Sequence, residues 1–238
     1  ILCNTDEDPA KEQSYLELMA DEQASGVTSP PSLEGLRRYS GGQWPFPLVL
    51  VDRALPDTPA DRVLLDNTAA AQRLTEHLLD AGYRRITALA GARSTTGQAR
   101  HPGYAQALPA RVLEPQQCWL QPTVEAGRAA TAELLNQHPA DRPDALLASN
   151  GLLLLGAAQA IQSAGLQMPH DIGLAGFDNN DWTTLPALDV TVIEQPTYEI
   201  GRTAAELLLQ RLAEPTRPVR SVVLEGRLLA RGSTRRGG

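Results

Sequence analysis

Three short apolar runs, each typical of a buried strand, end in polar residues. The run at 172–175 continues through Gly176 and Phe177 to Asp178. Ligands of open α/β sheets bind at the edge where the carboxyl ends of the strands lie. Asp178 is therefore a candidate for contact with a ligand. The runs at 48–51 and 145–148 are also followed by polar residues, which are Asp52, Arg53 and Asn150.

Helices are predicted between these runs. The helix expected at 152–164 stops at Gly165, because glycine takes the left-handed conformation that ends a helix at little cost. Strands and helices alternate in this way along the whole chain, which indicates βαβ units and parallel sheets. The units are too many for one small sheet. We therefore predict an α/β fold of two lobes, with the chain crossing between them more than once.

The composition favours a globular protein. Of 238 residues, 42% are hydrophobic and 21% are charged, which is sufficient for a core and argues against disorder. The net charge of −7 is unlike the basic surface of a free-standing DNA-binding domain. The two cysteines lie far apart, and the sequence shows neither a leader peptide nor an apolar run of membrane-spanning length. We expect a cytoplasmic protein without a membrane partner.

Motifs of enzymes and cofactor sites are missing from the sequence. It contains no phosphate-binding glycine loop, no nucleophile elbow and no His-Glu-x-x-His zinc motif. The four histidines fall in different expected elements, so no metal and no cofactor is predicted. A catalytic group assembled from residues distant in the sequence stays open as an alternative.

Several segments resemble the lactose-repressor and galactose-repressor (LacI/GalR-type) family of bacterial transcriptional regulators. Their order and spacing match over nearly the whole chain. The segments are 48–53 (LVLVDR), Asp66-Asn67, 82–86 (GYRRI), 89–91 (LAG), Arg100 with Gly103-Tyr104, 168–178 (MPHDIGLAGFD), Pro186 with Leu188, and 194–196 (EQP) with Gly201.

The resemblance implies two Rossmann-like lobes of periplasmic-binding-protein type, joined by three crossovers. The crossovers are expected near Ala90, Gln195 and Pro218. The N-terminal lobe would comprise residues 1–90 and 196–218, and the C-terminal lobe residues 91–195 and 219–238. Family members begin with a helix-turn-helix headpiece, a hinge, and a first strand and helix that this sequence lacks. We expect the chain to be part of a longer protein, unable to bind an operator by itself.

The family pattern also assigns roles to single residues. Asp178 matches the position whose carboxylate accepts hydrogen bonds from ligand hydroxyls, for which its several lone pairs are suited. Arg100 matches an arginine that reaches into the cleft between the lobes, and Thr96 a position that often offers a hydroxyl. Asp52 and Arg53 are candidates from the other lobe. For each of these residues the alternative is a helix cap or a surface charge.

Two positions depart from the family pattern. An Asn-Asp pair usually precedes the helix that Leu152 enters, whereas this chain has Asn150-Gly151. The carboxylate is lost, and Asn150 is expected to take over part of its role. A position that often holds an aromatic ring appears as Pro122, so Trp182 or Trp119 would supply a flat face instead, unless either ring simply packs.

These observations predict the ligand-sensing domain of a sugar-responsive bacterial transcriptional regulator. A sugar or sugar acid would bind between the lobes and change the operator affinity of a full-length homodimer. The replacement of the family carboxylate by Gly151 removes a negative charge from the cleft, while Arg100 remains and Arg53 is a second candidate arginine. This favours an acidic ligand over a neutral one. One alternative is the solute-binding protein of a sugar transporter, and another is an enzyme on a similar fold. The sequence does not identify the effector, whether it induces or corepresses, or the operator.

Overall fold

The computed structural model describes residues 1–238 except 7, 40–43, 56, 93, 109–115 and 237–238. The chain divides into two compact units. Unit 1 comprises Ile1–Leu65 and Pro196–Leu224, and unit 2 comprises Asp66–Gln195 and Glu225–Gly238. The chain thus passes from one unit to the other at 65/66, 195/196 and 224/225, and we call the residues around these points the crossing segments.

Unit 1 contains a four-stranded parallel sheet in the order β1-β2-β3-β9. Its strands are β1 (Val27–Ser29), β2 (Leu48–Val51), β3 (Asp61–Leu65) and β9 (Ser221–Leu224), and its helices are α1 (Pro9–Asp21), α2 (Leu33–Tyr39) and α7 (Thr197–Ala213). Neighbouring residues of β2 point to opposite faces of the sheet. Val49 packs with Ile200 of α7, whereas Leu50 packs with Leu16 of α1 and Leu36 of α2.

Unit 2 contains a six-stranded sheet in the order β10-β8-β7-β6-β4-β5. All neighbours are parallel except β10 and β8. The strands are β4 (Ile86–Gly91), β5 (Gln116–Leu120), β6 (Ala145–Ala148), β7 (Gly173–Phe177), β8 (Thr191–Glu194) and β10 (Arg227–Leu229). The helices are α3 (Asn67–Asp80), α4 (Thr95–Ala107), α5 (Val124–Leu135) and α6 (Gly151–Ser163), with short 3-10 turns η1 (Asp181–Thr184) and η2 (Gly232–Thr234).

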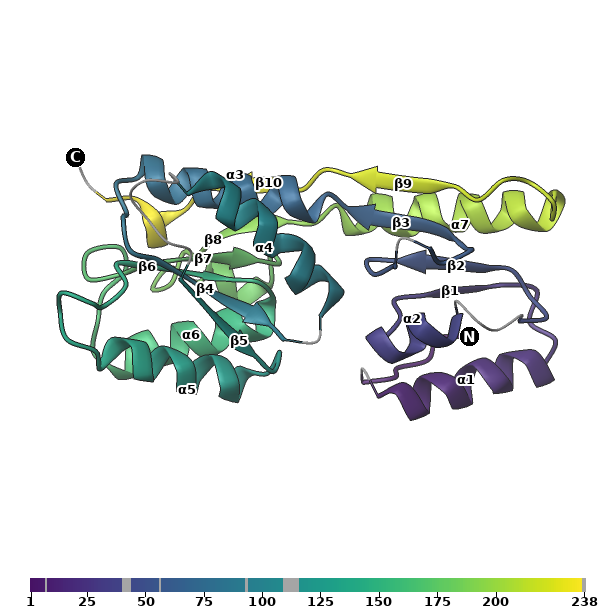
Figure 1. Ribbon diagram of the computed structural model, residues 1–238, viewed down its shortest axis with the longest axis horizontal. Helices are drawn as coiled ribbons and strands as arrows, with labels where there is room; N and C mark the ends of the chain where they lie inside the picture. Colours follow the sequence, from purple (N-terminus) through teal and green to yellow (C-terminus); the bar gives the residue numbers. More distant parts are fainter. Residues whose placement is uncertain (7, 40–43, 56, 93, 109–115, 237–238) are drawn as a thin grey trace. The chain divides into compact units, whose positions relative to one another are not determined.

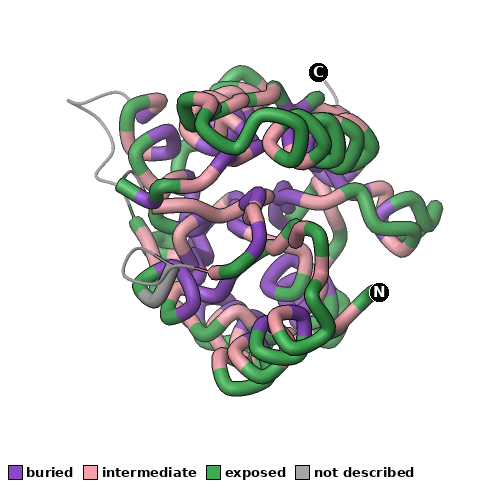
Figure 2. Tube along the Cα trace, turned by 90° about the vertical axis from the view of Figure 1, so that its right-hand side faces the viewer, coloured by how far each residue is buried: buried purple, intermediate pink, exposed green. Residues whose placement is uncertain are grey.

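Helices cover both faces of this second sheet. Figure 1 shows α3 and α4 on one face and α5 and α6 on the other. Because both faces are covered, β4, β6 and β7 are buried throughout. In the view of Figure 2, the outward-facing turns of the helices are largely exposed and buried residues lie further inside. Glycines allow α5 and α6 to approach closely. A Cβ atom on Gly156 would lie 2.2 Å from the carbonyl oxygen of Val124.

Some expectations differ from the structure. The first crossing at 65/66 precedes the one expected near Ala90, because α3 and β4 belong to the six-stranded sheet and its helical cover. The last crossing falls at 224/225 rather than near Pro218, since β9 still pairs with β3. From the sequence alone, residues 222–229 predict a single strand, whereas the structure has two strands there in two different sheets. The apolar sequence of residues 1–3 predicts a strand, but these residues form none.

The segment between Arg100 and Pro122 also differs. The sequence predicts a helix over 100–108, with Pro102 in its first turn. The helix instead starts at Thr95, with Ser94 as its cap, so Pro102 lies inside it. The turn-forming residues of 109–122 predict an irregular stretch, but this stretch contains the edge strand β5. Part of that stretch, 109–115, lies outside the described residues.

Candidate functional site

The carboxyl ends of four neighbouring strands of unit 2 meet at one edge, which we call the rim. The pairing of β4, β6, β7 and β8 puts Leu89, Ala148, Gly176 and Val192 in one row across the sheet. The residues that follow this row along each strand form the rim. Asn150 and Asp178, predicted from strand ends, are thereby brought to the same edge.

Asp178 follows β7 directly and is half-buried. Its backbone is left-handed, with φ of 76°, and its N–H donates to the carbonyl oxygen of Ile193 at 3.0 Å. Its Oδ2 accepts from the N–H of Gly151 at 3.0 Å, and its Oδ1 accepts from Nε2 of Gln195 at 2.7 Å. The carboxylate is thus fixed in place, and it retains lone pairs with which to accept hydrogen bonds from ligand hydroxyls.

Arg100 reaches the rim from the second turn of α4 and is 3% exposed. Its guanidinium lies 3.6 Å from the centre of the Phe177 ring, and its Nε donates to Oδ1 of Asn67 at 2.7 Å. Its Nη1 donates to the backbone carbonyl of Ser149. A guanidinium at this edge of the sheet has the charge and the geometry to form charge-assisted hydrogen bonds with an anion.

Two further predicted residues lie at the N-termini of helices. Asn150 is the N-cap of α6, where its Oδ1 accepts from the N–H of Leu153 at 2.9 Å. Thr96 is 7% exposed, and its hydroxyl lies 2.7 Å from that of Ser94, the N-cap of α4. Asn150 thus has the alternative function expected for such residues, helix capping, whereas Thr96 contacts the residue that caps α4.

Gly151 lies against the side chains of Asn180 and Asp178. A Cβ atom at this position would lie 2.8 Å from Nδ2 of Asn180 and 3.2 Å from Oδ2 of Asp178. The carboxylate of Asp178 itself therefore occupies the N-terminus of α6, where a negative charge is stabilised by the helix dipole.

Trp182 belongs to η1 and is half-buried, with its ring packed against the core cluster of unit 2. Trp119, the other candidate for a flat face, is 43% exposed on β5, where it meets the ring of His101 edge-on at 5.7 Å. Both rings thus have packing partners inside unit 2.

Asp52 and Arg53 lie in unit 1, at the end of β2. Their side chains form an ion pair of 3.6 Å. Asp52 has φ of 63°, and its N–H donates to the carbonyl oxygen of Val63 on the neighbouring strand at 3.0 Å. Asp52 and Asp178 therefore share one local arrangement: a left-handed aspartate that ends a parallel strand and donates to the next one.

Three uncharged side chains that hydrogen-bond to charged residues at or near the rim were not predicted from the sequence. Asn67, 8% exposed, and Gln195 bind Arg100 and Asp178 directly. Asn179 is the third such side chain: its Nδ2 donates to Glu194 at 2.8 Å, and its Oδ1 accepts from Arg231 at 2.6 Å. The hydrogen bond from Asn179, followed by that from Arg227, lowers the pKa of Glu194.

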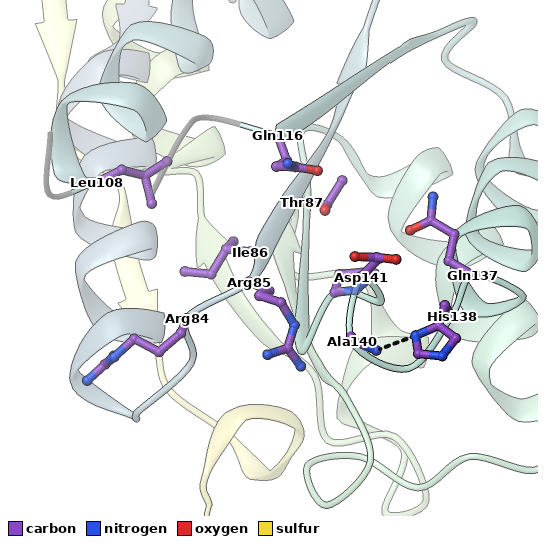
Figure 3. A pocket seen from close by; sticks show the side chains of 11 residues that line it. Arg84, Arg85, Ile86, Thr87, Leu108, Gln116, Gln137, His138, Ala140 and Asp141 are labelled. Carbon is purple, nitrogen blue, oxygen red and sulfur yellow. Dashed lines mark hydrogen bonds between the residues drawn. The ribbon is translucent and has the colours of Figure 1, made fainter. Parts of the chain in front are cut away.

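A cavity of about 630 Å³ lies away from the rim, at the amino ends of β4 and β5 (Figure 3). Arg85, Thr87, His138 and Asp141 are among its lining residues. Arg85 is engaged by the carbonyl oxygen of Arg142 at 2.8 Å. The lining mixes positive and negative side chains and points to no single ligand chemistry, so the rim is the better candidate site.

Within the described residues, no three His, Cys, Asp or Glu side chains are grouped as a metal ion would require. Over the same part of the chain, each helix is too short or too polar to cross a membrane.

Comparisons with known proteins agree with this architecture. Residues 75–234 match the model of a periplasmic binding protein-like domain. The chain is 31% identical over 242 residues to the transcriptional regulator PtxS of Pseudomonas putida, covering 98% of this chain and 69% of that protein.

Solved structures are similar as well. A complex of the transcriptional regulator CelR with cellobiose has a TM-score of 0.83 at 27% identity, covering 94% of this chain and 70% of that one. A LacI family regulator from Enterococcus faecium with bound ribose has a TM-score of 0.79 at 25% identity, covering 98% and 86%. The fold, the strand-end residues and these relatives together establish that the chain belongs to the lactose-repressor and galactose-repressor (LacI) family of transcriptional regulators, of which it comprises the ligand-sensing domain.

Proposed function

We propose that the rim of unit 2 binds a sugar or sugar acid as the effector of this regulator. The observation that carries the proposal is that Arg100 and Asp178 both lie at one sheet edge, each held by hydrogen bonds to neighbouring groups. A guanidinium and a carboxylate suit a ligand that has hydroxyls at one end and an acidic group at the other. Regulators of similar structure have been solved with cellobiose and ribose.

An acidic sugar derivative fits the charges better than a neutral sugar. Gly151 brings no carboxylate to the rim, while Arg100 presents a buried guanidinium there. A charge-assisted hydrogen bond from an arginine contributes about 1.5–3 kcal/mol. The competing explanation is that Gly151 makes room for a bulkier neutral sugar, in a space bordered by Nδ2 of Asn180 and the carboxylate of Asp178. Asp52, Arg53, Asn150, Thr96 and Trp182 stay candidate contacts.

Isothermal calorimetry of gluconate, 2-ketogluconate, galactose and glucose tests this proposal. We expect the acids to bind the wild-type chain and to lose roughly 10- to 150-fold in affinity in Arg100→Ala, from the same 1.5–3 kcal/mol. Tight binding of neutral sugars without the acids would contradict it. So would acid binding that survives the loss of both Arg53 and Arg100.

In this proposal the domain makes and breaks no bond, works in the cytoplasm and acts as a homodimer. Ligand binding would change the fit of two headpieces to two operator half-sites, with a coupling of about 1–3 kcal/mol typical of such systems. Sedimentation of the chain should show a dimer at micromolar concentration, and incubation with the four ligands should leave them unchanged. A monomer, or turnover of a ligand, would contradict the respective part.

The acidic chain is not expected to bind an operator by itself. A gel shift with the 238-residue chain should show no sequence-selective, salt-sensitive complex. Such a complex would mean that DNA contacts lie in this domain.

A further inference from the structure

Each of the two charged rim residues is hydrogen-bonded to a side chain at a crossing segment. Asn67 lies two residues after the crossing at 65/66, and its Oδ1 accepts from Nε of Arg100 at 2.7 Å. Gln195 is the last residue before the crossing at 195/196, and its Nε2 donates to Oδ1 of Asp178 at 2.7 Å. We propose that Asn67 and Gln195 are positioning residues that tie these two crossing segments to Arg100 and Asp178. The proposal rests on the function proposed above, since it concerns regulation of the same site.

Each bond joins a rigid partner to a segment that leaves the unit. Arg100 is 3% exposed and stacked on Phe177, and Asn67 is 8% exposed at the start of α3. Asp178 is fixed by the N–H of Gly151 as well as by Gln195. Both bonds involve one charged partner, and such bonds are stronger than those between neutral groups. A ligand that hydrogen-bonds to Arg100 or Asp178 would therefore compete with, or strengthen, the bond from that residue to Asn67 or Gln195 at the crossing segment.

The third crossing provides a contrast within the same chain. Arg227, two residues beyond the start of unit 2 at Glu225, pairs with Glu194 at 2.8 Å, but its side chain is 70% exposed. Exposed ion pairs contribute little because solvent screens them. This bond also involves neither Arg100 nor Asp178. The crossing at 224/225 should therefore be insensitive to changes at the two charged rim residues.

Hydrogen–deuterium exchange of the ligand-free chain tests the proposal. In Asp178→Ala, amides in 191–199 should exchange roughly tenfold faster, while 64–70 and 222–225, which lie outside the ladder of β8, keep their rates. In Arg100→Met, which keeps the apolar stem beside Phe177, 64–70 should respond and 191–199 should not. Asp178→Asn retains an acceptor for Gln195 and should restore slow exchange. A general loss of stability would not produce such a crossed pattern.

Reciprocal variants guard against a failure of Arg100→Met to fold. Asn67→Ala should speed exchange in 64–70, and Asn67→Asp, whose carboxylate still accepts from Arg100, should not. Equal responses of both segments to each variant, or no response in either, would overturn the proposal. Arg85→Ala, at the end of the sheet opposite the rim, serves as the control and should leave both segments unchanged. Because no ligand is added, an absence of sugar binding in the calorimetry would refute the proposed function and leave this test in force.

Discussion

Placing a carboxylate at position 151 gives the sharpest test of why this chain has glycine there. Gly151→Asp puts back the charge that family members carry, and Gly151→Asn adds a side chain of the same shape without the charge. A Cβ atom would lie 2.8 Å from Nδ2 of Asn180, an exposed and flexible side chain that can rotate away. The steric cost should therefore be small and shared by both variants.

The electrostatic cost belongs to Gly151→Asp alone. With its Cβ atom 3.2 Å from Oδ2 of Asp178, the new carboxylate would lie about 5 Å from the existing one, where two charges repel by about 3 kcal/mol at an effective dielectric constant of 20. Partial exposure of Asp178 roughly halves this, and the N-terminus of α6 returns about 0.3–1 kcal/mol. We expect Gly151→Asp to be about 1 kcal/mol less stable than Gly151→Asn.

The effect on binding should be larger for an acid than for a neutral ligand. A like charge near the bound acid costs about 1.5–3 kcal/mol, so 2-ketogluconate should bind Gly151→Asp roughly 10- to 150-fold more weakly than Gly151→Asn. Calorimetry measures the affinities, and urea unfolding the stabilities. Equal affinity of 2-ketogluconate for the two variants would refute the reasoning, as would glucose or galactose binding that improves only in Gly151→Asp.

Three further results are expected. Asn150→Ala should lower the stability of the chain by about 1 kcal/mol in urea unfolding, because α6 loses its cap; an unchanged midpoint would show that the cap contributes nothing. Arg211→Met should cost about 3–5 kcal/mol, since Asp61, 1% exposed, would keep a buried charge without its ion pair; recovery in the double variant with Asp61→Asn checks this cause. Burial lowers the pKa of His77 below 6.5, so the unfolded chain takes up the proton first and stability falls as the pH drops through about 6.5; a pH series of unfolding should show a shallower fall in His77→Gln, and identical slopes would contradict it.

The rim was predictable where a buried strand ends in a polar residue. The run before Asp178 is apolar because both faces of the sheet are covered, so the strand and its end stand out in the sequence. By contrast, β5 is an edge strand that begins with two glutamines and has no fully buried residue, which hides it among turn-forming neighbours. Likewise, β9 and β10 read as one strand because nothing local reveals that they pair with β3 and β8 in different sheets.

The holding side chains of the rim could not be found in the same way. Asn67 lies 33 residues from Arg100, and Gln195 lies 17 residues from Asp178. Neither has a local pattern that marks it as a partner, because the pairing depends on how α3 packs beside α4 and on β8 lying next to β7. Only the tertiary structure brings them together.

Backbone conformation supplies an argument that sequence patterns cannot. Asp52 and Asp178 both end a parallel strand with positive φ, and each donates its N–H to the neighbouring strand. A left-handed non-glycine residue costs about 1–3 kcal/mol, which glycine would avoid. Asparagine and aspartate tolerate this region better than other residues, but they do not match glycine. Glycine would be more stable at both positions, yet each unit has aspartate there, which is explained if the carboxylate itself is needed. At Asp178 the hydrogen bonds with Gly151 and Gln195 show that the carboxylate is directed at the rim.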